Sequence, residues 1–404
     1  MSKNTRQPGA YDAVLGGIAP DLSSVAVLGG IDAVQLHLQS DSLSIKLAAL
    51  NKALNYGEAG VELVIKALDD SLQQVKLRAY QLLKKKNQAK IFQAFRDRRF
   101  DYYNLSECLR KLENDSSAVI SLAISPDSQS LVSSSWNQTI SLWDINSGQC
   151  LKIFKGHTRY VWSVAITSDG RNIVSGSWDK LIKIWNIDDG QCLRTLNGHT
   201  GSIYSVAITP DSQYIVSASF DKTIKIWALS SGQCLRTLKG HCDLVTSVAI
   251  TPDGQYIVSA SFDKTIKIWA LSSGQCLRTL QGHTSGLKSV VIAPDGQTII
   301  TGANDHTIKL WNINDGQCLK TLKGHSGAVL SLTVDPNGQF ILSGAEDTKI
   351  KIWNINDGQC IKTIQAHSTW VKSIAIAQDS QSFVSGSWDG MIKIWGIPED
   401  QRSC

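Results

Sequence analysis

The chain has 404 residues, of which 42% are hydrophobic and 19% are charged, and its formal net charge at pH 7 is +5. This length is sufficient for two domains. No run of about 18 apolar residues occurs, so the sequence predicts no membrane span. It also contains no CxxC, HExxH, Walker or GxGxxG motif, and it therefore predicts no metal site, no cofactor and no enzyme activity.

Residues 1–103 are predicted to form a small all-α domain with a linker at its end. Helical periodicity is found in four segments, residues 42–56, 58–69, 71–85 and 88–97. Gly57 separates the first two segments, and Asp70 or Ser71 can cap the third.

A weak repeat with an offset of 30 residues runs through these helices, because Ile45-Lys46-Leu47-Ala48-Ala49 matches Val75-Lys76-Leu77-Arg78-Ala79. This repeat resembles the helical pairs of the HEAT type. So few pairs are not expected to be stable alone. We therefore expect the domain to dock on the rest of the chain or on a partner.

The leader carries one motif twice, at residues 13–18 and 26–31. It resembles leaders of cyanobacterial multidomain proteins. Residues 13–19 make a poor signal-peptide core, since Asp12 precedes them and Pro20 follows. We therefore expect a cytoplasmic protein.

Positive charge is concentrated in the helical region, which has 14 Lys and Arg against 10 Asp and Glu. Many of the basic residues fall in one cluster: Lys84, Lys85, Lys86, Lys90, Arg96, Arg98 and Arg99. A solvated helix face explains such a cluster. The alternative is a weak contact with an anionic surface, either phosphates or lipid headgroups.

The remaining chain, residues 104–404, is dominated by a repeat of 42 residues. Seven tryptophans keep this spacing without a slip: Trp143, Trp185, Trp227, Trp269, Trp311, Trp353 and Trp395. Within the repeat around Trp227, residues 204–209, 214–219, 223–228 and 234–238 are predicted strands separated by turns. Each unit is therefore predicted to be a four-stranded antiparallel meander.

These residues resemble the WD-repeat family. Gly-His recurs from Gly156-His157 to Gly324-His325, with the variant Ala366-His367, and Trp-Asp survives at Trp143-Asp144. The resemblance implies an all-β propeller of seven blades around a central channel, so the expected fold is a seven-bladed β-propeller plus the small helical domain.

The resemblance also implies a buried hydrogen-bonded tetrad of His, Ser or Thr, Asp and Trp in each complete repeat. The expected members are His157, Ser175, Asp179, Trp185; His199, Ser217, Asp221, Trp227; His241, Ser259, Asp263, Trp269; His283, Thr301, Asp305, Trp311; His325, Ser343, Asp347, Trp353; and His367, Ser385, Asp389, Trp395. These groups can donate and accept in a relay that leaves no atom unpaired. A Ser-His-Asp nucleophile is the alternative, but six copies in one chain favour a structural role.

Repeat one departs from this pattern, because Asn114-Asp115 replaces Gly-His and Asn137 replaces the turn Asp. Its tetrad is expected to be missing. At the other end, no clear fourth strand follows Trp395. Residues 107–112 match residues 149–154, so they are expected to complete the last blade and to remove an exposed edge strand.

Seven of the nine cysteines follow the repeat: Cys108, Cys150, Cys192, Cys234, Cys276, Cys318 and Cys360. They lie on different blades, too far apart for disulfides. They are expected to be small buried residues of the outer strands. Unpaired cysteines suit a reducing compartment.

In WD-repeat proteins, binding residues cluster on the top face, near the start of the inner strand and just before the turn Asp. At these positions this chain has Lys288, Lys372 and a single carboxylate, Glu346. Aromatic residues at these positions come from blades seven, one, two, three and four, and they form a predicted aromatic arc: Trp136, Tyr160, Trp162, Trp178, Tyr204, Phe220, Phe262, Trp370 and Trp388. Packing against neighbouring loops is the alternative to partner binding.

The sequence therefore predicts a non-enzymatic scaffold that binds a protein or peptide on this arc. No small-molecule substrate is expected. The alternative is a peripheral membrane or nucleic-acid adaptor, recruited through the basic helical domain and assisting a larger transport or regulatory complex. Salt dependence of binding separates the two hypotheses.

Overall fold

The computed structural model describes residues 30–40, 42–70, 72–84, 107–113, 117–378, 380 and 382–396. It divides into two compact units, one ending at Phe100 and the other beginning at Asp101. The expected helix at 88–97, the basic residues from Lys85 to Arg99 and most of the leader lie outside the described residues.

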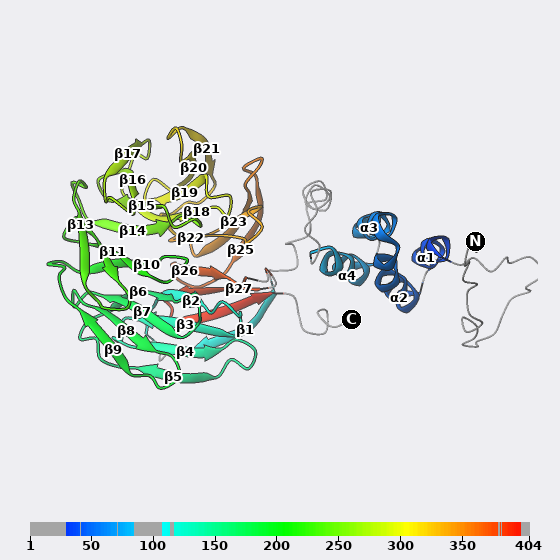
Figure 1. Ribbon diagram of the computed structural model, residues 1–404, viewed down its shortest axis with the longest axis horizontal. Coiled ribbons are helices and arrows are strands. Elements are labelled where there is room, and N and C mark those ends of the chain that lie inside the picture. The colour runs from blue at the N-terminus through cyan, green and yellow to red at the C-terminus, as the bar shows by residue number, and fades with distance from the viewer. Residues whose placement is uncertain are drawn as a thin grey trace, which may run out of the picture. The chain divides into compact units, whose positions relative to one another are not determined.

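The first unit is helical (Figure 1). Its elements are α1 (Ile31–Leu38), α2 (Leu43–Ala53), the 3-10 turn η1 (Leu54–Tyr56), α3 (Gly57–Lys66), the 3-10 turn η2 (Ala67–Asp69) and α4 (Gln73–Lys84). Leu50, Val64, Val75 and Leu83 form a fully buried core. Helix α1 was not predicted, because it has eight residues with Val34 alone buried, and this is too short for a clear periodicity.

Asp70 lies between η2 and α4, ahead of Gln73, the first residue of α4. Its carboxylate accepts a hydrogen bond from the backbone N–H of Leu72 at 2.9 Å and pairs with Lys46 at 2.7 Å. Both charged side chains are largely buried. The pair ties α4 to α2, so the small unit gains a polar link as well as an apolar core.

The second unit is a ring of four-stranded antiparallel sheets, or blades (Figure 1). Strand order from the centre outward follows the sequence in six blades. These are blade 1, β2 (Val119–Ile124), β3 (Ser130–Ser135), β4 (Ile140–Asp144) and β5 (Cys150–Phe154); blade 2, β6 (Val161–Ile166), β7 (Asn172–Ser177), β8 (Ile182–Asn186) and β9 (Cys192–Leu196); blade 3, β10 (Ile203–Ile208), β11 (Tyr214–Ser219), β12 (Ile224–Ala228) and β13 (Cys234–Leu238); blade 4, β14 (Val245–Ile250), β15 (Tyr256–Ser261), β16 (Thr265–Ala270) and β17 (Cys276–Gln281); blade 5, β18 (Leu287–Ile292), β19 (Thr298–Ala303), β20 (Thr307–Asn312) and β21 (Cys318–Lys323); and blade 6, β22 (Val329–Val334), β23 (Phe340–Ala345), β24 (Lys349–Asn354) and β25 (Cys360–Gln365).

Blade 7 joins the two ends of the ring. It contains β26 (Val371–Ile376), β27 (Ser382–Ser387) and β28 (Met391–Gly396), and its outer strand is β1 (Glu107–Glu113), which pairs antiparallel with β28. Leu112 of β1 packs with Ile392 and with Val119 of blade 1. A Cβ on Gly386 would lie 2.4 Å from a Val119 methyl carbon, so the first and last blades meet at close approach.

Innermost strands of successive blades touch around the whole ring, including β2 against β26. Hydrogen bonds reinforce most of these joints, because a serine on one innermost strand accepts from a backbone N–H of the next at 3.0–3.3 Å. At the closing joint, Leu122 N donates to Ser373 Oγ at 3.0 Å. The ring is thus a seven-bladed β-propeller, as the sequence predicted.

The repeated tryptophans fill the spaces between blades. Trp227 is 1% exposed and packs with Val174 and Ile184 of the preceding blade and with Ile215 of its own. Loss of a buried ring of this size costs roughly 3–5 kcal/mol. The strict spacing of these residues therefore reflects one repeated packing contact.

The expectation of buried outer-strand cysteines was wrong. Cys234 is half-buried and the other six of the repeated series are exposed. The outer strand has a neighbour on one side alone, so its small residues face solvent. Each Sγ lies 3.4–3.8 Å from the carbonyl oxygen two residues later, and no disulfide joins the eight cysteines in the described part of the chain.

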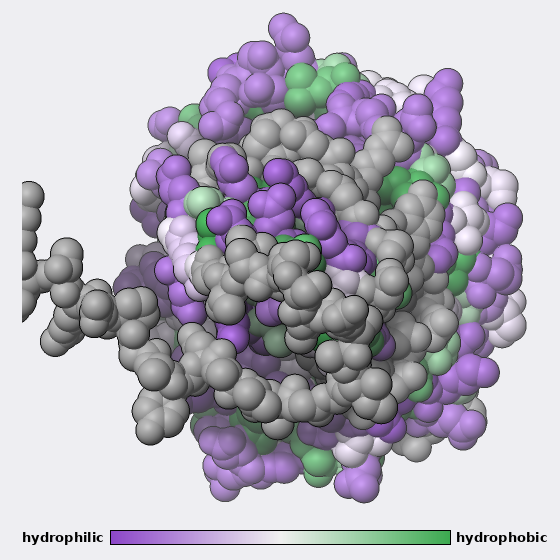
Figure 2. Space-filling model, turned by 90° about the vertical axis from the view of Figure 1, so that its right-hand side faces the viewer, coloured by the Kyte–Doolittle hydropathy of each residue, from purple (hydrophilic) through white to green (hydrophobic). Residues whose placement is uncertain are grey.

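The propeller surface is largely hydrophilic in the view of Figure 2, with separate hydrophobic patches. Exposed leucines stand directly after the outer-strand cysteines, for example Leu151, Leu193 and Leu319. Singly exposed residues of this kind are normal. Within the described residues, no helix is long and apolar enough to cross a membrane.

Candidate functional site

The repeated polar residues meet in six hydrogen-bonded groups. His Nδ1 lies 2.7–3.0 Å from a carboxylate oxygen of the turn Asp. His Nε2 lies 2.7–2.8 Å from the Ser or Thr oxygen. That oxygen accepts the Trp indole N–H at 2.8–2.9 Å. These partners require the Nδ1–H tautomer, since a carboxylate can only accept.

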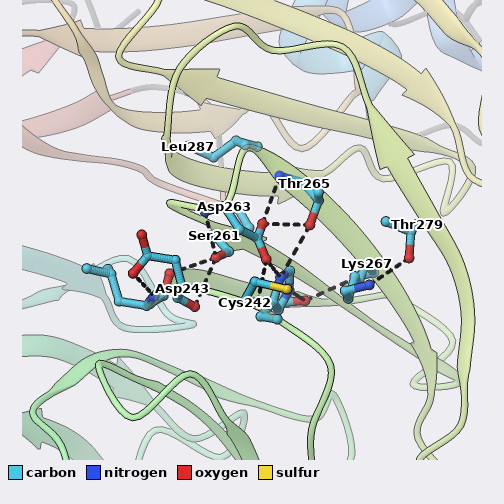
Figure 3. A network of polar contacts seen from close by, with 12 residues as sticks. Cys242, Asp243, Ser261, Asp263, Thr265, Lys267, Thr279 and Leu287 are labelled. Carbon is cyan, nitrogen blue, oxygen red and sulfur yellow. Dashed lines mark hydrogen bonds and ion pairs between the residues drawn. The ribbon is translucent and has the colours of Figure 1, made fainter.

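The turn Asp holds each group in place, as repeat four shows (Figure 3). The Asp263 carboxylate accepts from the backbone N–H groups of Cys242 and Thr265 at 2.9 Å and from the Thr265 hydroxyl at 2.6 Å. Burial alone would raise the pKa of Asp263, but hydrogen bonds from His241, Thr265 and the Cys242 backbone outweigh it and hold the pKa well below 3.8. The carboxylate therefore stays ionised beside a buried imidazole.

Repeat one keeps half of this group. Trp143 donates to Ser133 at 2.8 Å, as in the other blades. Asn137 replaces the turn Asp and accepts from the backbone N–H and hydroxyl of Thr139. The residues that replace Gly-His lie outside the described part of the chain.

The Ser-His-Asp groups cannot present a nucleophile to a substrate. The six hydroxyl-bearing residues are 0% exposed. Each oxygen also accepts an indole N–H. A nucleophile must reach the reacting atom, so this arrangement supports a structural role for the six groups.

One face of the ring is built by a contact that recurs in every blade. The residue directly before the turn Asp, or before Asn137 in repeat one, donates its backbone N–H to a carbonyl oxygen just ahead of the innermost strand. Trp178 donates in this way to Tyr160 at 2.9 Å, and Trp388 donates to Trp370 at 3.2 Å. This contact brings two side chains of each blade to the same end of the sheet. We call this end the top face.

A β-bulge adds a third side chain in each blade. Every innermost strand shifts register around its second residue, which leaves that residue without a partner in the ladder. Bulges redirect side chains. The seven bulge residues are Ile120, Trp162, Tyr204, Thr246, Lys288, Leu330 and Lys372. They form a ring on the innermost strands, and we call it the channel mouth.

Seven of the nine predicted arc residues form one continuous chain of ring contacts. The chain runs from Trp370 through Trp388, Trp136, Tyr160, Trp178 and Trp162 to Tyr204, with centroid separations of 4.7–5.4 Å between successive rings. Trp162 and Trp178 are stacked at 5.0 Å with 16° between their planes. The rings come from blades 7, 1, 2 and 3, so the arc crosses the junction where the propeller closes.

The other two predicted residues lie apart from this chain. Phe220 is 55% exposed. Phe262 lies against Gly286 and under the Lys288 ammonium group, 4.5 Å from the ring centroid. Of the nine aromatic residues, Phe220 and Trp370 are exposed and the others are half-buried.

The arc contains three buried indole N–H groups, those of Trp136, Trp178 and Trp388, with no acceptor among the described residues. The repeated tryptophans differ, since each donates to a Ser or Thr oxygen. An unpaired buried donor costs about 1–3 kcal/mol. The arc therefore has less internal hydrogen-bond stabilisation than the fully paired tetrads.

Two lysines of the channel mouth complete the top face. Lys372 extends to Trp162, with its Nζ 4.7 Å from the ring centroid, and Lys288 lies over Phe262. The sequence predicted top-face positions for both lysines, but it predicted partner binding for the aromatic residues alone. The signal that could have identified them is their register, which is the same as that of Trp162 and Tyr204.

The fold and the tetrads define a seven-bladed β-propeller whose blades share one set of buried polar contacts. The chain belongs to the WD-repeat family. The family described as "WD domain, G-beta repeat" matches residues 106–144, 148–186, 190–228, 232–270, 274–312, 316–354 and 358–396, which together make up well over half of the chain. Propellers of this family are generally non-catalytic scaffolds and typically bind protein partners. A comparison with curated proteins found no match.

Proposed function

We propose that this protein is a scaffold that binds a protein segment across the aromatic arc. The observation that carries the proposal is the unbroken chain of seven rings from four blades, which no tetrad contact requires. Trp, Tyr and Arg dominate the energetics of protein interfaces. An arc containing five tryptophans concentrates such residues on one side of the top face.

The chemistry of the arc favours an apolar or proline-rich segment. Its flat rings offer stacking surface to apolar side chains and to proline rings, which dock on aromatic grooves at low entropic cost. Blades 5 and 6 supply Asn304, Leu330 and Glu346 instead of aromatic rings at the equivalent positions. We therefore place the partner over blades 7, 1, 2 and 3. The six exposed thiols of the repeated series favour a reducing, cytoplasmic setting for this interaction.

A capture experiment with the full chain tests the proposal. Proteins retained by the wild type are compared by mass spectrometry with those retained by the Trp162→Ala/Trp178→Ala variant. Tyr256→Ala is the matched control, because Tyr256 begins β15 at the end opposite Phe262. The proposal requires partners that the wild type and the control retain and the double variant loses.

Salt dependence separates this function from recruitment through the basic helical region. Binding to the arc rests mainly on apolar contacts and is expected to weaken only modestly between low and high salt. Binding to phosphates or anionic lipids weakens steeply with salt. Partners that are retained by the double variant and released by salt would contradict the proposal.

A further inference from the structure

The channel mouth carries positive charge that the fold does not neutralise. Within the described residues, neither Lys288 nor Lys372 has a carboxylate within ion-pair distance, although six histidines and Lys46 do. Each ammonium group instead faces an aromatic ring. An ammonium group that faces an aromatic ring can still donate hydrogen bonds through its N–H groups to a ligand.

The charge of Lys288 acts on Lys372 at the channel mouth. Burial, followed by the charge of Lys288, lowers the pKa of Lys372 to about 8, and burial also lowers the pKa of Lys288. The carboxylate of Glu346 opposes the shift at both lysines. Two partly buried cations with one acidic neighbour leave a net positive site on a rim whose other bulge residues are uncharged.

We propose that the partner segment carries an acidic residue whose carboxylate binds between Lys288 and Lys372 while its apolar neighbours lie on the aromatic arc. This inference rests on the proposed function and names the chemistry of its partner. The lysines and the arc belong to one continuous surface, because Lys372 touches Trp162, a member of both. An apolar residue on the arc therefore places an adjacent acidic residue within reach of the mouth.

A single carboxylate fits this mouth better than a polyanion. Ile120 and Leu330 are buried bulge residues beside the lysines, so the positive region is small and has apolar sides. Glu346 on the same face repels additional negative charge. A nucleic acid or an anionic membrane needs several phosphate contacts for comparable affinity, and the mouth provides two cations.

Binding of a carboxylate near Lys372 should be accompanied by proton uptake, which apolar packing on the arc alone would not produce. Near pH 8 part of Lys372 is neutral, and a bound carboxylate favours its charged form, so binding should take up protons. Lys288, whose pKa burial also lowers, would add to this uptake, whereas Tyr204 would not contribute. Burial raises the pKa of Tyr204 above its ordinary 10.0, and none of the seven bulge residues is a histidine. Affinity for an acidic peptide should fall as the pH rises from about 7 to 9.

The test selects ligands without assuming their sequence. A library of random dodecapeptides displayed on phage is selected on the full chain, and enriched peptides are synthesised and titrated by calorimetry. Peptides dependent on the arc are those that lose affinity for Trp162→Ala/Trp178→Ala. Within this group, we expect an Asp or Glu next to apolar or proline residues.

Lysine variants then separate charge from packing. Lys288→Met/Lys372→Met should weaken the acidic peptides at least ten-fold, and replacing the acidic residue of the peptide by its amide should weaken wild-type binding similarly. Lys372→Arg should retain affinity because it keeps the charge. Lys323→Met is the matched control, since Lys323 is an exposed lysine at the end of β21.

The selected peptides test the acidic residue of the partner separately from the scaffold function. Arc-dependent peptides without an acidic residue, or with unchanged affinity for the methionine variant, would overturn the inference and leave the scaffold function intact. If no selected peptide depends on the arc, both proposals fail. Proton uptake near pH 8 that disappears in Lys372→Met supports the inference.

Discussion

Each tetrad buries polar side chains between apolar strands without leaving a donor or acceptor unpaired. In repeat three, Trp227 donates to Ser217, Ser217 to His199 and His199 to Asp221, at 2.8 Å in every step. The His and Ser side chains are almost fully buried. A buried polar group without a partner costs more than an average hydrogen bond contributes. One missing member therefore affects the other three.

We predict that His241→Ala destabilises the propeller by about 1–3 kcal/mol, because it leaves Ser259 and Asp263 without their shared partner. Chemical denaturation followed by circular dichroism measures the loss. Partner binding should stay nearly unchanged, since His241 lies outside the arc. Unchanged stability would contradict the structural role of the tetrad.

The protein should also lose stability in acid. The folded-state pKa values of the tetrad aspartates, such as Asp221 and Asp389, lie below 3.8, and burial lowers the pKa of His283 below 6.5. In both cases the unfolded chain binds more protons than the folded chain as the pH falls, so protonation favours unfolding. The loss should begin below about pH 6.5 and steepen below about pH 5.

Melting temperatures measured at successive pH values test this expectation. Asp389→Asn is the informative variant, because it removes one lowered carboxyl pKa. It should be less stable than the wild type at neutral pH and should lose less stability on acidification. A melting temperature that is constant down to about pH 4 would show that these carboxyl groups are not coupled to folding.

The sequence repeats and the structural blades are offset from each other by one strand. A repeat such as 148–186 contains β5 of blade 1 and then β6, β7 and β8 of blade 2. Because each sequence unit spans two blades, the first unit begins with a strand that belongs to the last blade. That strand is β1, and it covers the edge of β28 that would otherwise be unpaired.

Deletion of residues 104–113 should therefore open the ring. The edge of β28 and the apolar residues that pack on Leu112 would be exposed, and aggregation is expected. Size-exclusion chromatography with light scattering measures it. Deletion of residues 1–29, ahead of the first described helix, is the control. A soluble, monomeric 104–113 deletion would contradict this role of β1.

Period-two alternation predicted the strands, because it follows directly from which side chains face the core. It did not predict the bulges, since one extra residue in a strand leaves the alternation on either side intact. The expected strand at 204–209 begins at the bulge residue, whereas β10 begins at Ile203. The side-chain directions of Tyr204 and Lys372 at the channel mouth therefore required the structure.

Across the whole propeller, the repeated residues form the contacts within and between blades, and the residues that differ between repeats determine the chemistry of the top face. The 42-residue spacing predicted the fold, because every blade packs its neighbour in the same way. Burial was less predictable. The outer-strand cysteines recur as strictly as the tryptophans but lie at an unpaired edge, and recurrence alone does not distinguish the two positions. The contact between Lys372 and Trp162 joins blades 7 and 2, a relation that no spacing within one repeat reveals.

The central claim is that the aromatic arc is the surface on which this propeller binds its partner. Isothermal titration of a captured partner into the wild type, Trp162→Ala, Trp178→Ala and Tyr256→Ala tests it most directly. The arc predicts a loss of at least about 2 kcal/mol of binding free energy for each tryptophan variant and little change for Tyr256→Ala. Melting temperatures of the wild type and the two tryptophan variants should stay close together, because the arc contributes little to the fold. Equal affinity of the wild type and both tryptophan variants would contradict the claim.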